Sequence, residues 1–302
     1  MELYIDAERA GKTVFDVLRR ELGFSNRLLA RLKQDERGIL VDGERVTVRY
    51  PLRRGQRLTL AVEDRSQSET ILPVDLPVSV LYEDEFLWGV NKPPEMPTHP
   101  SHGHYDDTLA NALAWYAAQR GEPFVFRPVN RLDRNTSGVV LIARDQRAAG
   151  VLARTMQQRQ MKKRYLALLD GELYPDAGTL SAPIRRRAES IIFREVCGEG
   201  EGDEAITAWR VLARDGGYTL VEASPETGRT HQLRVHFAHL GCPIHGDDLY
   251  GNAAEDMPRQ ALHASTLTFP HPVTGEEIIL KAPLPEDFRN LLITLFGKDM
   301  LL

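Results

Sequence analysis

The chain has 302 residues, and at about 150 residues per domain this length predicts two domains with enough chain for buried cores. Hydrophobic residues make up 42% and charged residues 27%, a composition that excludes a disordered chain, and no apolar run reaches the ~20 residues of a membrane-spanning helix. The formal net charge of −5 argues against a protein coated in nucleic acid.

The N-terminus and the cysteines indicate a compartment. Residues 1–6 contain acids early and lack the basic and apolar regions of a signal peptide. Cys197 and Cys242 are too few for a disulfide framework and do not have zinc-finger spacing. We therefore expect a cytoplasmic protein with two reduced thiols.

Residues 1–64 begin with two helical patterns. Thr13, with Asp16 three residues later, is typical of a capping box, and the first helix should end by Gly23. Ser25 should begin a second helix that ends by Gly38. The side chains expected to face the core are Val14, Val17, Leu18, Leu22, Leu28, Leu29 and Leu32.

A hairpin and a linker should follow the two helices. The Asp42-Gly43 pair lies between the apolar run 39–41 and the strand-like segment 45–48, which predicts a β-hairpin. Residues 64–70 are polar and free of large apolar side chains. We therefore predict a module at 1–64, a linker at 65–75 and a second domain at 76–302.

The second domain has the pattern of an α+β fold. Strand-like apolar runs alternate with helical stretches, which predicts a mixed or antiparallel sheet. The expected strands are 87–90, 138–143, 165–169 and 218–221, and the expected helices are 109–119 and 148–158. The acidic run 198–204 lacks a strand-turn-helix context, so we expect a loop there.

One segment of this domain is strongly basic. Residues 127–164 contain ten Lys and Arg side chains and only two acids, Asp133 and Asp145. Such a segment is a candidate phosphate-binding surface. The alternative is a solvated helix face that acids elsewhere in the chain balance.

Several common kinds of site lack their sequence motifs. The chain contains no GxxxxGK[ST], GxSxG or HExxH motif, which argues against nucleotide hydrolysis, α/β-hydrolase chemistry and zincin chemistry. Histidines and acids that could hold a metal are loosely spaced, and such side chains more often form local hydrogen bonds. We therefore expect no metal at these candidates, which are His99, His102, His104, Asp106, Asp107, His236 and His239.

The most informative polar segment is 127–137, which precedes the apolar run 138–143. It places Asp133 among three arginines, where a carboxylate is expected to stay ionised, and the following strand can hold the loop at a cleft. Asp133 is therefore a candidate nucleophile or base. The alternative is a structural aspartate in a cap or an ion pair.

Two further segments could join Asp133. A basic run enters a strand at Tyr165, which can stack on a base or pack in a core. Thr230 is expected to cap a helix that ends at Gly241. Arg234 on this helix needs a carboxylate partner if it is buried, and we expect that partner to be Asp133.

Together these segments resemble the motifs of the RluA-type pseudouridine synthases, which isomerise uridines in ribosomal and transfer RNA. The resemblance covers about residues 75–290, and residues 1–64 resemble the small S-four-like RNA-binding module that often precedes this domain. The matching segments are 91–94, 130–138, 163–168, 228–236, 243–251, 262–264, 271–272, 274–276 and 282–285.

The resemblance implies a mechanism. Asp133 would be the nucleophile that attacks a uridine flipped out of its RNA, Tyr165 would stack on the base and assist proton removal, and Arg234 would pair with Asp133. Asn130 stands where many members carry histidine, which puts a catalytic role for this position in doubt. The residues implied in substrate binding are Arg131, Arg134, Lys163, Arg229 and His231.

The resemblance also implies the partners. No cofactor and no metal would be required, the substrate would be ribosomal or transfer RNA, and we expect a monomer. Two alternatives remain open at this point. A non-catalytic RNA-binding or ribosome-assembly factor would use the same cleft, and a hydrolase would need a second carboxylate, for which no recognisable candidate is present.

Overall fold

The structure is a computed structural model that describes residues 1–24, 26–61 and 71–297. The side chain of Arg27 is also outside the described part, and the predicted linker falls largely on residues 62–70, which are not described. No helix among the described residues is long and apolar enough to cross a membrane.

The N-terminal unit, residues 1–61, has its own sheet and its own core. Strands β1 (Glu2–Tyr4), β4 (Arg57–Leu60), β2 (Ile39–Val41) and β3 (Glu44–Arg45) pair in that order, all antiparallel. Helices α1 (Val14–Asp16) and α2 (Asn26–Gln34) pack on this sheet, with a π-helical turn, η1 (Val17–Glu21), after α1. Buried side chains from within residues 5–60 form this core.

Local signals predicted much of this unit. The Thr13 hydroxyl accepts a hydrogen bond from the backbone N–H of Asp16, which is the predicted capping box. Asp42 and Gly43 both have positive φ, 52° and 88°, as a tight hairpin turn requires. The first helix is shorter than expected because it gives way to η1, and the return strand is only β3. Strands β1 and β4 were not predicted.

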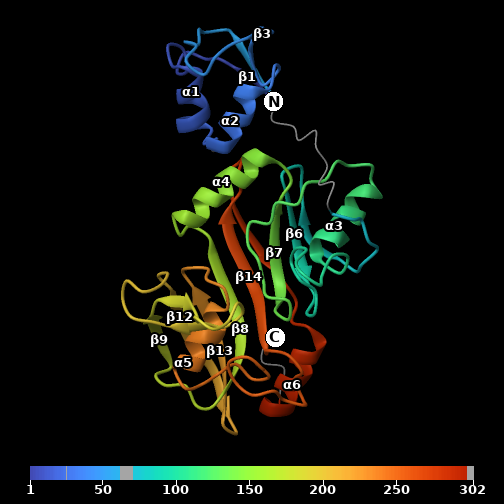
Figure 1. Ribbon diagram of the computed structural model, residues 1–302, viewed down its shortest axis with the longest axis vertical. Coiled ribbons are helices and arrows are strands. Elements are labelled where there is room, and N and C mark those ends of the chain that lie inside the picture. Colours follow the sequence, from blue (N-terminus) through green and yellow to red (C-terminus); the bar gives the residue numbers. More distant parts are fainter. Residues whose placement is uncertain (25, 62–70, 298–302) are drawn as a thin grey trace.

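The rest of the chain is built on a nine-stranded mixed sheet (Figure 1). Among the described strand pairs only β7 and β14 run parallel. The strand order is β5-β6-β7-β14-β8-β13-β12-β9, with β15 paired to β14. The strands are β5 (Ser79–Glu83), β6 (Leu87–Lys92), β7 (Ser137–Ala143), β8 (Lys162–Asp170), β9 (Ala177–Ser181), β12 (Ile206–Asp215), β13 (Tyr218–Pro225), β14 (Leu262–Pro270) and β15 (Glu277–Lys281).

Four helices cover this sheet: α3 (Leu109–Ala118), α4 (Gln146–Gln157), α5 (Gln232–His239) and α6 (Glu286–Phe296). On β7, Val140 and Ile142 join the core beneath α3, whereas Val139 and Leu141 join the core beneath α4. Both faces of β7 are therefore covered, which explains its continuous apolar sequence. The predicted strands and helices of this region are confirmed with small shifts of their ends, and so is the mixed sheet.

A glycine allows β7 and β14 to approach each other closely. Gly138 has φ +119°, and a Cβ atom there would lie 2.2 Å from the carbonyl oxygen of Ala264. A larger residue would therefore separate the two parallel strands. Since Gly138 follows the Asp133 loop directly, this close approach also determines where that loop leaves the sheet.

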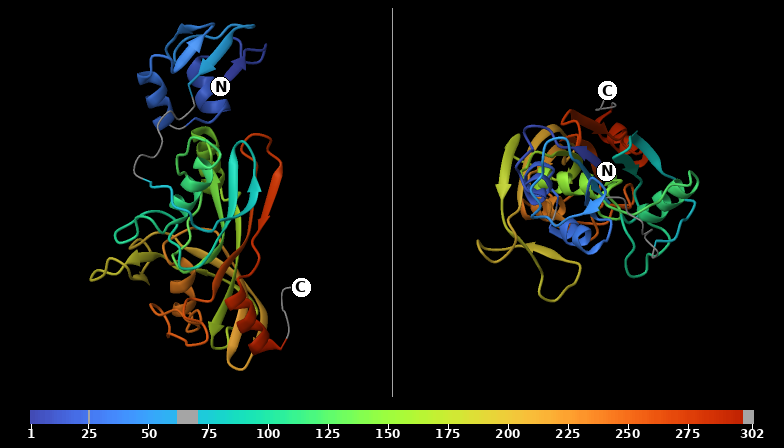
Figure 2. Two further views of the ribbon diagram at one scale, coloured as in Figure 1. Left: turned by 90° about the vertical axis from the view of Figure 1, so that its right-hand side faces the viewer. Right: turned by 90° about the horizontal axis from the view of Figure 1, so that it is seen from above.

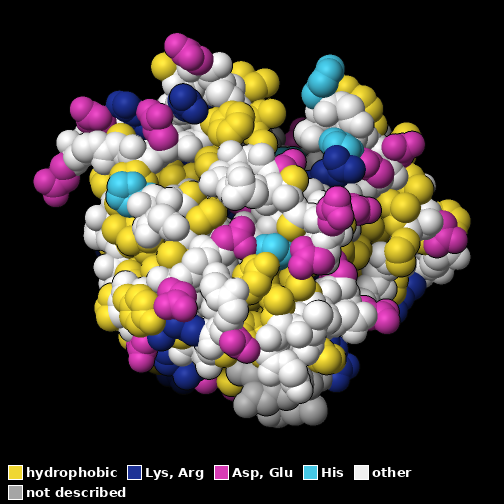
Figure 3. All heavy atoms as spheres, turned by 90° about the horizontal axis from the view of Figure 1, so that it is seen from below, with side chains coloured by type: hydrophobic (Ala, Val, Ile, Leu, Met, Phe, Trp, Pro, Cys, Tyr) yellow, Lys and Arg dark blue, Asp and Glu magenta, His cyan; other side chains and the backbone are white. Residues whose placement is uncertain are grey.

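The end of the molecule that carries the N-terminal unit differs from the end that carries α6. The N-terminal unit lies beside α4 (Figure 1), where the Arg154 guanidinium occupies the space that a side chain at position 23 would need. At the opposite end, which carries α6, acidic side chains are spread among hydrophobic and neutral ones (Figure 3). Lys and Arg are not gathered into one surface in that view, so this end offers no broad basic face to a polyanion.

Candidate active site

A cavity of about 460 Å³ lies where the three predicted segments meet. This volume is within the range of small-ligand sites, about 300–1,000 Å³. Of the predicted site residues, the cavity is lined by Arg131, Asp133, Lys163, Tyr165, Arg229, His231 and Arg234. Arg134 is the exception: it is exposed, and its Nε donates to the carbonyl of Glu95 at 3.2 Å.

The loop that carries Asp133 is held by its neighbours on both sides. The Thr98 hydroxyl donates to the carbonyl of Leu132 at 2.9 Å and accepts from its N–H at 3.2 Å. The Asn130 amide donates to the carbonyl of Val139 and accepts from the N–H of Leu141, both on β7. Asn130 therefore uses both ends of its amide to anchor the loop, which is a structural role.

Lys92 also anchors this loop, at the residue that follows Asp133, and it was not predicted as a site residue. Its side chain is fully buried, and its Nζ donates to the carbonyls of Pro93, Met96 and Arg134 at 2.7–2.9 Å. Burial lowers the pKa of Lys92 to about 7, and the charge of Asp133 opposes that shift. The signals for this role were its place directly after the predicted strand 87–90 and Asn91, and within the matched segment 91–94.

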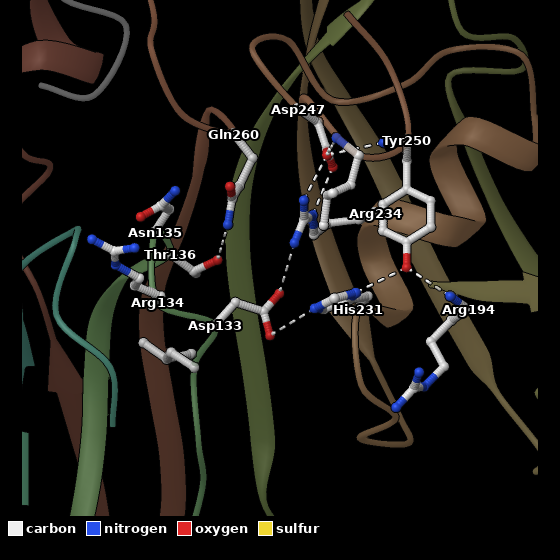
Figure 4. A network of polar contacts seen from close by, with 12 residues as sticks. Asp133, Arg134, Asn135, Thr136, Arg194, His231, Arg234, Asp247, Tyr250 and Gln260 are labelled. Atoms are coloured by element: carbon white, nitrogen blue, oxygen red, sulfur yellow. Dashed lines mark hydrogen bonds and ion pairs between the residues drawn. The ribbon is translucent and has the colours of Figure 1, made fainter. Parts of the chain in front are cut away.

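The Asp133 carboxylate projects toward α5 (Figure 4). The nearest side-chain nitrogens to its oxygens are Arg234 Nη1 at 3.7 Å and His231 Nε2 at 4.0 Å, and its side chain is 28% exposed. No described side chain or backbone N–H is within hydrogen-bond distance of its oxygens, although Asp133 is surrounded by donors. This carboxylate is therefore oriented by an ion pair without a hydrogen bond, and its oxygens are available to a substrate.

Arg234 is buried, and it pairs with Asp247 as well as with the expected Asp133. Its Nε and Nη2 donate to the two carboxylate oxygens of Asp247 at 2.7 and 2.6 Å (Figure 4). Burial alone would lower the pKa of Arg234, but the hydrogen bonds and the charge of Asp247 raise it. The prediction of a carboxylate partner is confirmed. The expected ion pair with Asp133 is present at 3.7 Å, and the hydrogen-bonded partner Asp247, within the matched segment 243–251, was not predicted.

His231 begins α5 in place of the predicted Thr230 cap. It has φ 58° and precedes the first helical residue, and no side chain caps this helix. Its Nδ1 is 2.9 Å from the hydroxyl of Tyr250, which also accepts a hydrogen bond from the backbone N–H of Arg194. The hydrogen bond between Nδ1 and this hydroxyl can run in either direction, according to the tautomer of His231, and Nε2 faces Asp133. Burial lowers the pKa of His231, so the neutral ring is favoured.

Tyr165 serves both the core and the cavity. Its ring packs against two of the hydrophobic core clusters, and it also lines the cavity. Burial and the charge of Asp133 raise the pKa of Tyr165, so its hydroxyl keeps its proton. Lys163, two residues earlier on the same strand, donates to the carbonyl of Thr227 at 3.0 Å.

Comparison with known proteins shows the family of this chain. Residues 87–239, just over half of the chain, match the model of the family described as RNA pseudouridylate synthase. The chain belongs to this family. An uncharacterized RNA pseudouridine synthase of Bacillus subtilis, YjbO, is 39% identical over 90% of this chain and 95% of its own length. The ribosomal large subunit pseudouridine synthase D of Xanthomonas campestris is 38% identical over 85% of this chain and 80% of its own length.

A solved structure agrees with this assignment. The human RNA pseudouridylate synthase domain containing 1 superposes with a TM-score of 0.58 at 30% identity, covering 68% of this chain and 83% of that chain. The predicted RluA-type family is therefore confirmed. The chain is an RNA pseudouridine synthase, an isomerase.

Several arginines of the basic segment 127–164 have partners within the protein. Arg127 is half-buried and donates to the carbonyls of Val125 and Arg144. Arg144 pairs with Glu122, Arg159 with Glu204 and Glu226, and Arg164 with Glu222. For these residues the structure favours the alternative that the sequence left open, in which acids distant in the chain balance the basic side chains.

The histidines considered as metal ligands have other partners. His104 Nδ1 is 2.6 Å from Asp107, and His236 contacts the Thr207 hydroxyl and the carbonyl of Ala182. Over the described ranges, no three His, Cys, Asp or Glu side chains are arranged to hold a metal ion. These contacts assign both histidines to local structure.

Proposed function

We propose that this synthase converts specific uridines of structured RNA, in particular large-subunit ribosomal RNA, to pseudouridine through a covalent intermediate on Asp133. The observation that carries the proposal is the Asp133 carboxylate, which borders the cavity with two cationic or donor groups nearby and no hydrogen-bond partner among the described residues. The choice of ribosomal RNA rests on the relative named for the large ribosomal subunit.

The reaction begins with a uridine outside its base stack, because the reacting edge of the ring is hidden in a helix. Asp133 attacks either the uracil ring or the ribose, and the bond between N1 and C1′ breaks. The uracil turns, C5 bonds to C1′ and loses its proton, and N1 gains one. Asp133 is displaced as C5 bonds to C1′ if it was joined to the ribose, or it leaves as C5 loses its proton if it was joined to the ring. Substrate and product are therefore isomers, and no group from a cofactor is needed.

The other cavity residues have supporting roles in this proposal. The Tyr165 ring stacks on the target base. Its raised pKa keeps the hydroxyl protonated, which argues against the expected part in proton removal. Arg131 is exposed at the cavity and holds the flipped-out geometry. Lys163, Arg229 and His231 bind the substrate from the β8 and α5 sides.

Mapping of pseudouridines in cells tests the proposal. RNA from a strain that lacks this gene is compared with RNA from strains that carry the wild-type gene or Asp133→Asn. We expect specific pseudouridines in large-subunit ribosomal RNA to be absent from the strain without the gene and to return only with the wild-type gene. Sites restored equally by Asp133→Asn would contradict the nucleophile. Loss of sites in transfer RNA alone would show that the substrate is transfer RNA and would leave the proposed chemistry unchanged.

If no site changes, purified full-length protein on bulk unmodified RNA decides between two readings. Pseudouridine formation would indicate that a second enzyme covers the same sites in the cell. RNA binding without any pseudouridine would support the alternative, a non-catalytic RNA-binding or ribosome-assembly factor.

A further inference from the structure

A two-stranded hairpin beside the active site has no role in the chemistry described above. It consists of β10 (Ile184–Arg186) and β11 (Arg194–Val196), which pair antiparallel and are separate from the nine-stranded sheet. We refer to residues 184–196 as the β10–β11 hairpin. It extends away from the body of the molecule, in yellow at the left of the left-hand view in Figure 2.

The base of this hairpin is anchored firmly. Ile184 is buried with Val235 of α5, and Val196 packs against the same small cluster. His236 of α5 contacts the carbonyl of Ala182, just before the hairpin. The hairpin is therefore attached to the helix that carries Arg234.

The tip of the hairpin is ordered but exposed. The Ser190 hydroxyl accepts from the backbone N–H groups of Ile192 and Phe193, and the Arg194 guanidinium donates to the carbonyls of Ile191, Ile192 and Phe193. Nevertheless the side chain of Ile191 is 80% exposed and that of Ile192 is 52% exposed. Two adjacent isoleucines held out into water by a hydrogen-bonded turn are unusual for a structural role.

The hairpin also has cations available to a partner. It contains four arginines and two glutamates. Arg185 is neutralised by Glu195 and by Glu201 of the neighbouring acidic loop. Arg186 and Arg187 are exposed, and neither side chain has an ion pair or a hydrogen bond within the described residues. An apolar tip with two free guanidinium groups below it favours a partner that combines phosphates with apolar faces.

The hairpin lies close to the reacting carboxylate. Phe193 contacts the ring of Tyr250 edge to face at 5.8 Å, and the N–H of Arg194 donates to the Tyr250 hydroxyl at 2.9 Å. That hydroxyl contacts His231, which faces Asp133 (Figure 4). A strand of RNA that delivers a uridine to Asp133 would therefore pass beside the hairpin.

We propose that the β10–β11 hairpin is an RNA-binding arm, in which Arg186 and Arg187 bind backbone phosphates and Ile191 and Ile192 pack against unstacked bases that flank the target uridine. The chemistry is that of single-stranded or looped RNA, whose bases expose apolar faces between phosphates. The identity of the partner rests on the proposed function.

Two double variants of the full-length protein test the arm, Arg186→Ala with Arg187→Ala and Ile191→Ser with Ile192→Ser. Binding to unmodified, in-vitro-transcribed large-subunit ribosomal RNA is measured by filter retention over a range of salt concentrations. We expect each pair to weaken affinity on the order of tenfold. The arginine pair should also reduce the slope of log K against log salt by about 1.4, since each phosphate contact on single strands contributes about 0.7. The isoleucine pair should leave the slope unchanged.

A matched control uses an exposed isoleucine and a lysine from another part of the sheet, Ile279→Ser with Lys281→Ala on β15. Ile279 is 53% exposed, and β15 contributes none of the described residues that line the cavity. This control should bind like the wild type. Melting temperatures of all variants should match, because the substituted side chains are exposed.

The outcomes separate the arm from the proposed function. Unchanged affinity and unchanged pseudouridine formation in both hairpin variants, with an active wild type, would overturn the arm and leave the synthase mechanism intact. A wild type that forms no pseudouridine but loses affinity through the hairpin variants would overturn the proposed function and leave the arm standing.

Discussion

Two carboxylates contact different nitrogens of the same guanidinium, that of Arg234, and their surroundings differ. Asp247 is fully buried, and its oxygens accept two hydrogen bonds from Arg234 and further ones from the N–H groups of Leu249 and Tyr250. Asp133 is partly exposed, and the closest atom of Arg234 is 3.7 Å away. One carboxylate is saturated with hydrogen bonds, and the other keeps its oxygens available.

The difference fits two roles, with Asp247 positioning Arg234 and Asp133 available to a substrate. A saturated carboxylate holds Arg234 in one orientation, because any rotation of the guanidinium breaks a bidentate pair. An unsaturated carboxylate beside that guanidinium can form a bond to a substrate without first losing a strong partner. The loop of Asp133, anchored by Asn130 and Lys92, supplies the rigidity that the carboxylate itself does not receive.

The largest expected effect is on catalysis by Asp133→Asn. The amide cannot act as the nucleophile, so single-turnover formation of pseudouridine should fall by about a thousandfold or more. The free energy of unfolding, measured with urea, should change by less than about 1 kcal/mol, because the native carboxylate makes no hydrogen bond among the described residues. Residual turnover within tenfold of the wild type would refute the assignment.

Asp247→Asn is the matched variant at the saturated carboxylate. It leaves the buried Arg234 without its main counter-charge, and the free energy of unfolding should fall by about 3–5 kcal/mol. Activity of the folded fraction should also fall, because Arg234 is then free to move toward Asp133. If Asp247→Asn were as stable as Asp133→Asn in the same urea titration, the proposed division between the two carboxylates would fail.

His263 is a buried group with its hydrogen bonds made, as Asp247 is. Its two ring nitrogens are hydrogen-bonded to the Ser137 hydroxyl and to the carbonyl of Ala282. Burial lowers the pKa of His263 to about 4. Below about pH 6.5 the unfolded chain binds a proton at this side chain, and the folded protein does not bind one until about pH 4. Stability should therefore fall as pH decreases from 6.5 to 4.

This group accounts for up to about 3 kcal/mol of that loss. Urea titrations of the wild type and His263→Gln at pH 7 and pH 4.5 isolate it from other titrating groups. The variant should be less stable at pH 7 and should lose less stability on acidification. Parallel losses in the two proteins would show that His263 does not titrate in this range.

The smallest expected effect comes from the N-terminal unit, which has its own core and lies outside the cavity. We expect removal of residues 1–64 to weaken binding to large-subunit ribosomal RNA by about three- to tenfold and to broaden the choice of uridines. Filter binding and sequencing-based mapping of the product measure both. Unchanged affinity and target choice would reduce the unit to a scaffold.

Local patterns in the sequence were sufficient for many elements. Thr13 and Asp16 form a capping box because the hydrogen bonds join residues only three positions apart. The apolar run that became β7 and the turn at Asp42 and Gly43 likewise depend on neighbouring residues. Strand β1 carried too short a pattern to be predicted, because its three residues become a strand only by pairing with β4.

The candidate site was predictable as a set of segments but not as a set of contacts. The motif around Asp133, the strand of Tyr165 and the helix of Arg234 do meet at one cavity, as the family resemblance implied. Three features were missed: the role of Lys92, the pairing of Asp247 with Arg234, and the link from Tyr250 to His231.

The sequence by itself determined the family, the main helices and strands, and the residue types available for chemistry, because these depend on local spacing and on motif identity. Only the tertiary structure decided which of two carboxylates near Arg234 is saturated and which is open. It also decided which arginines of the basic segment are neutralised by distant acids. The physical reason is that charge pairing and burial depend on distances in space, and these are set by the order in which the strands pack.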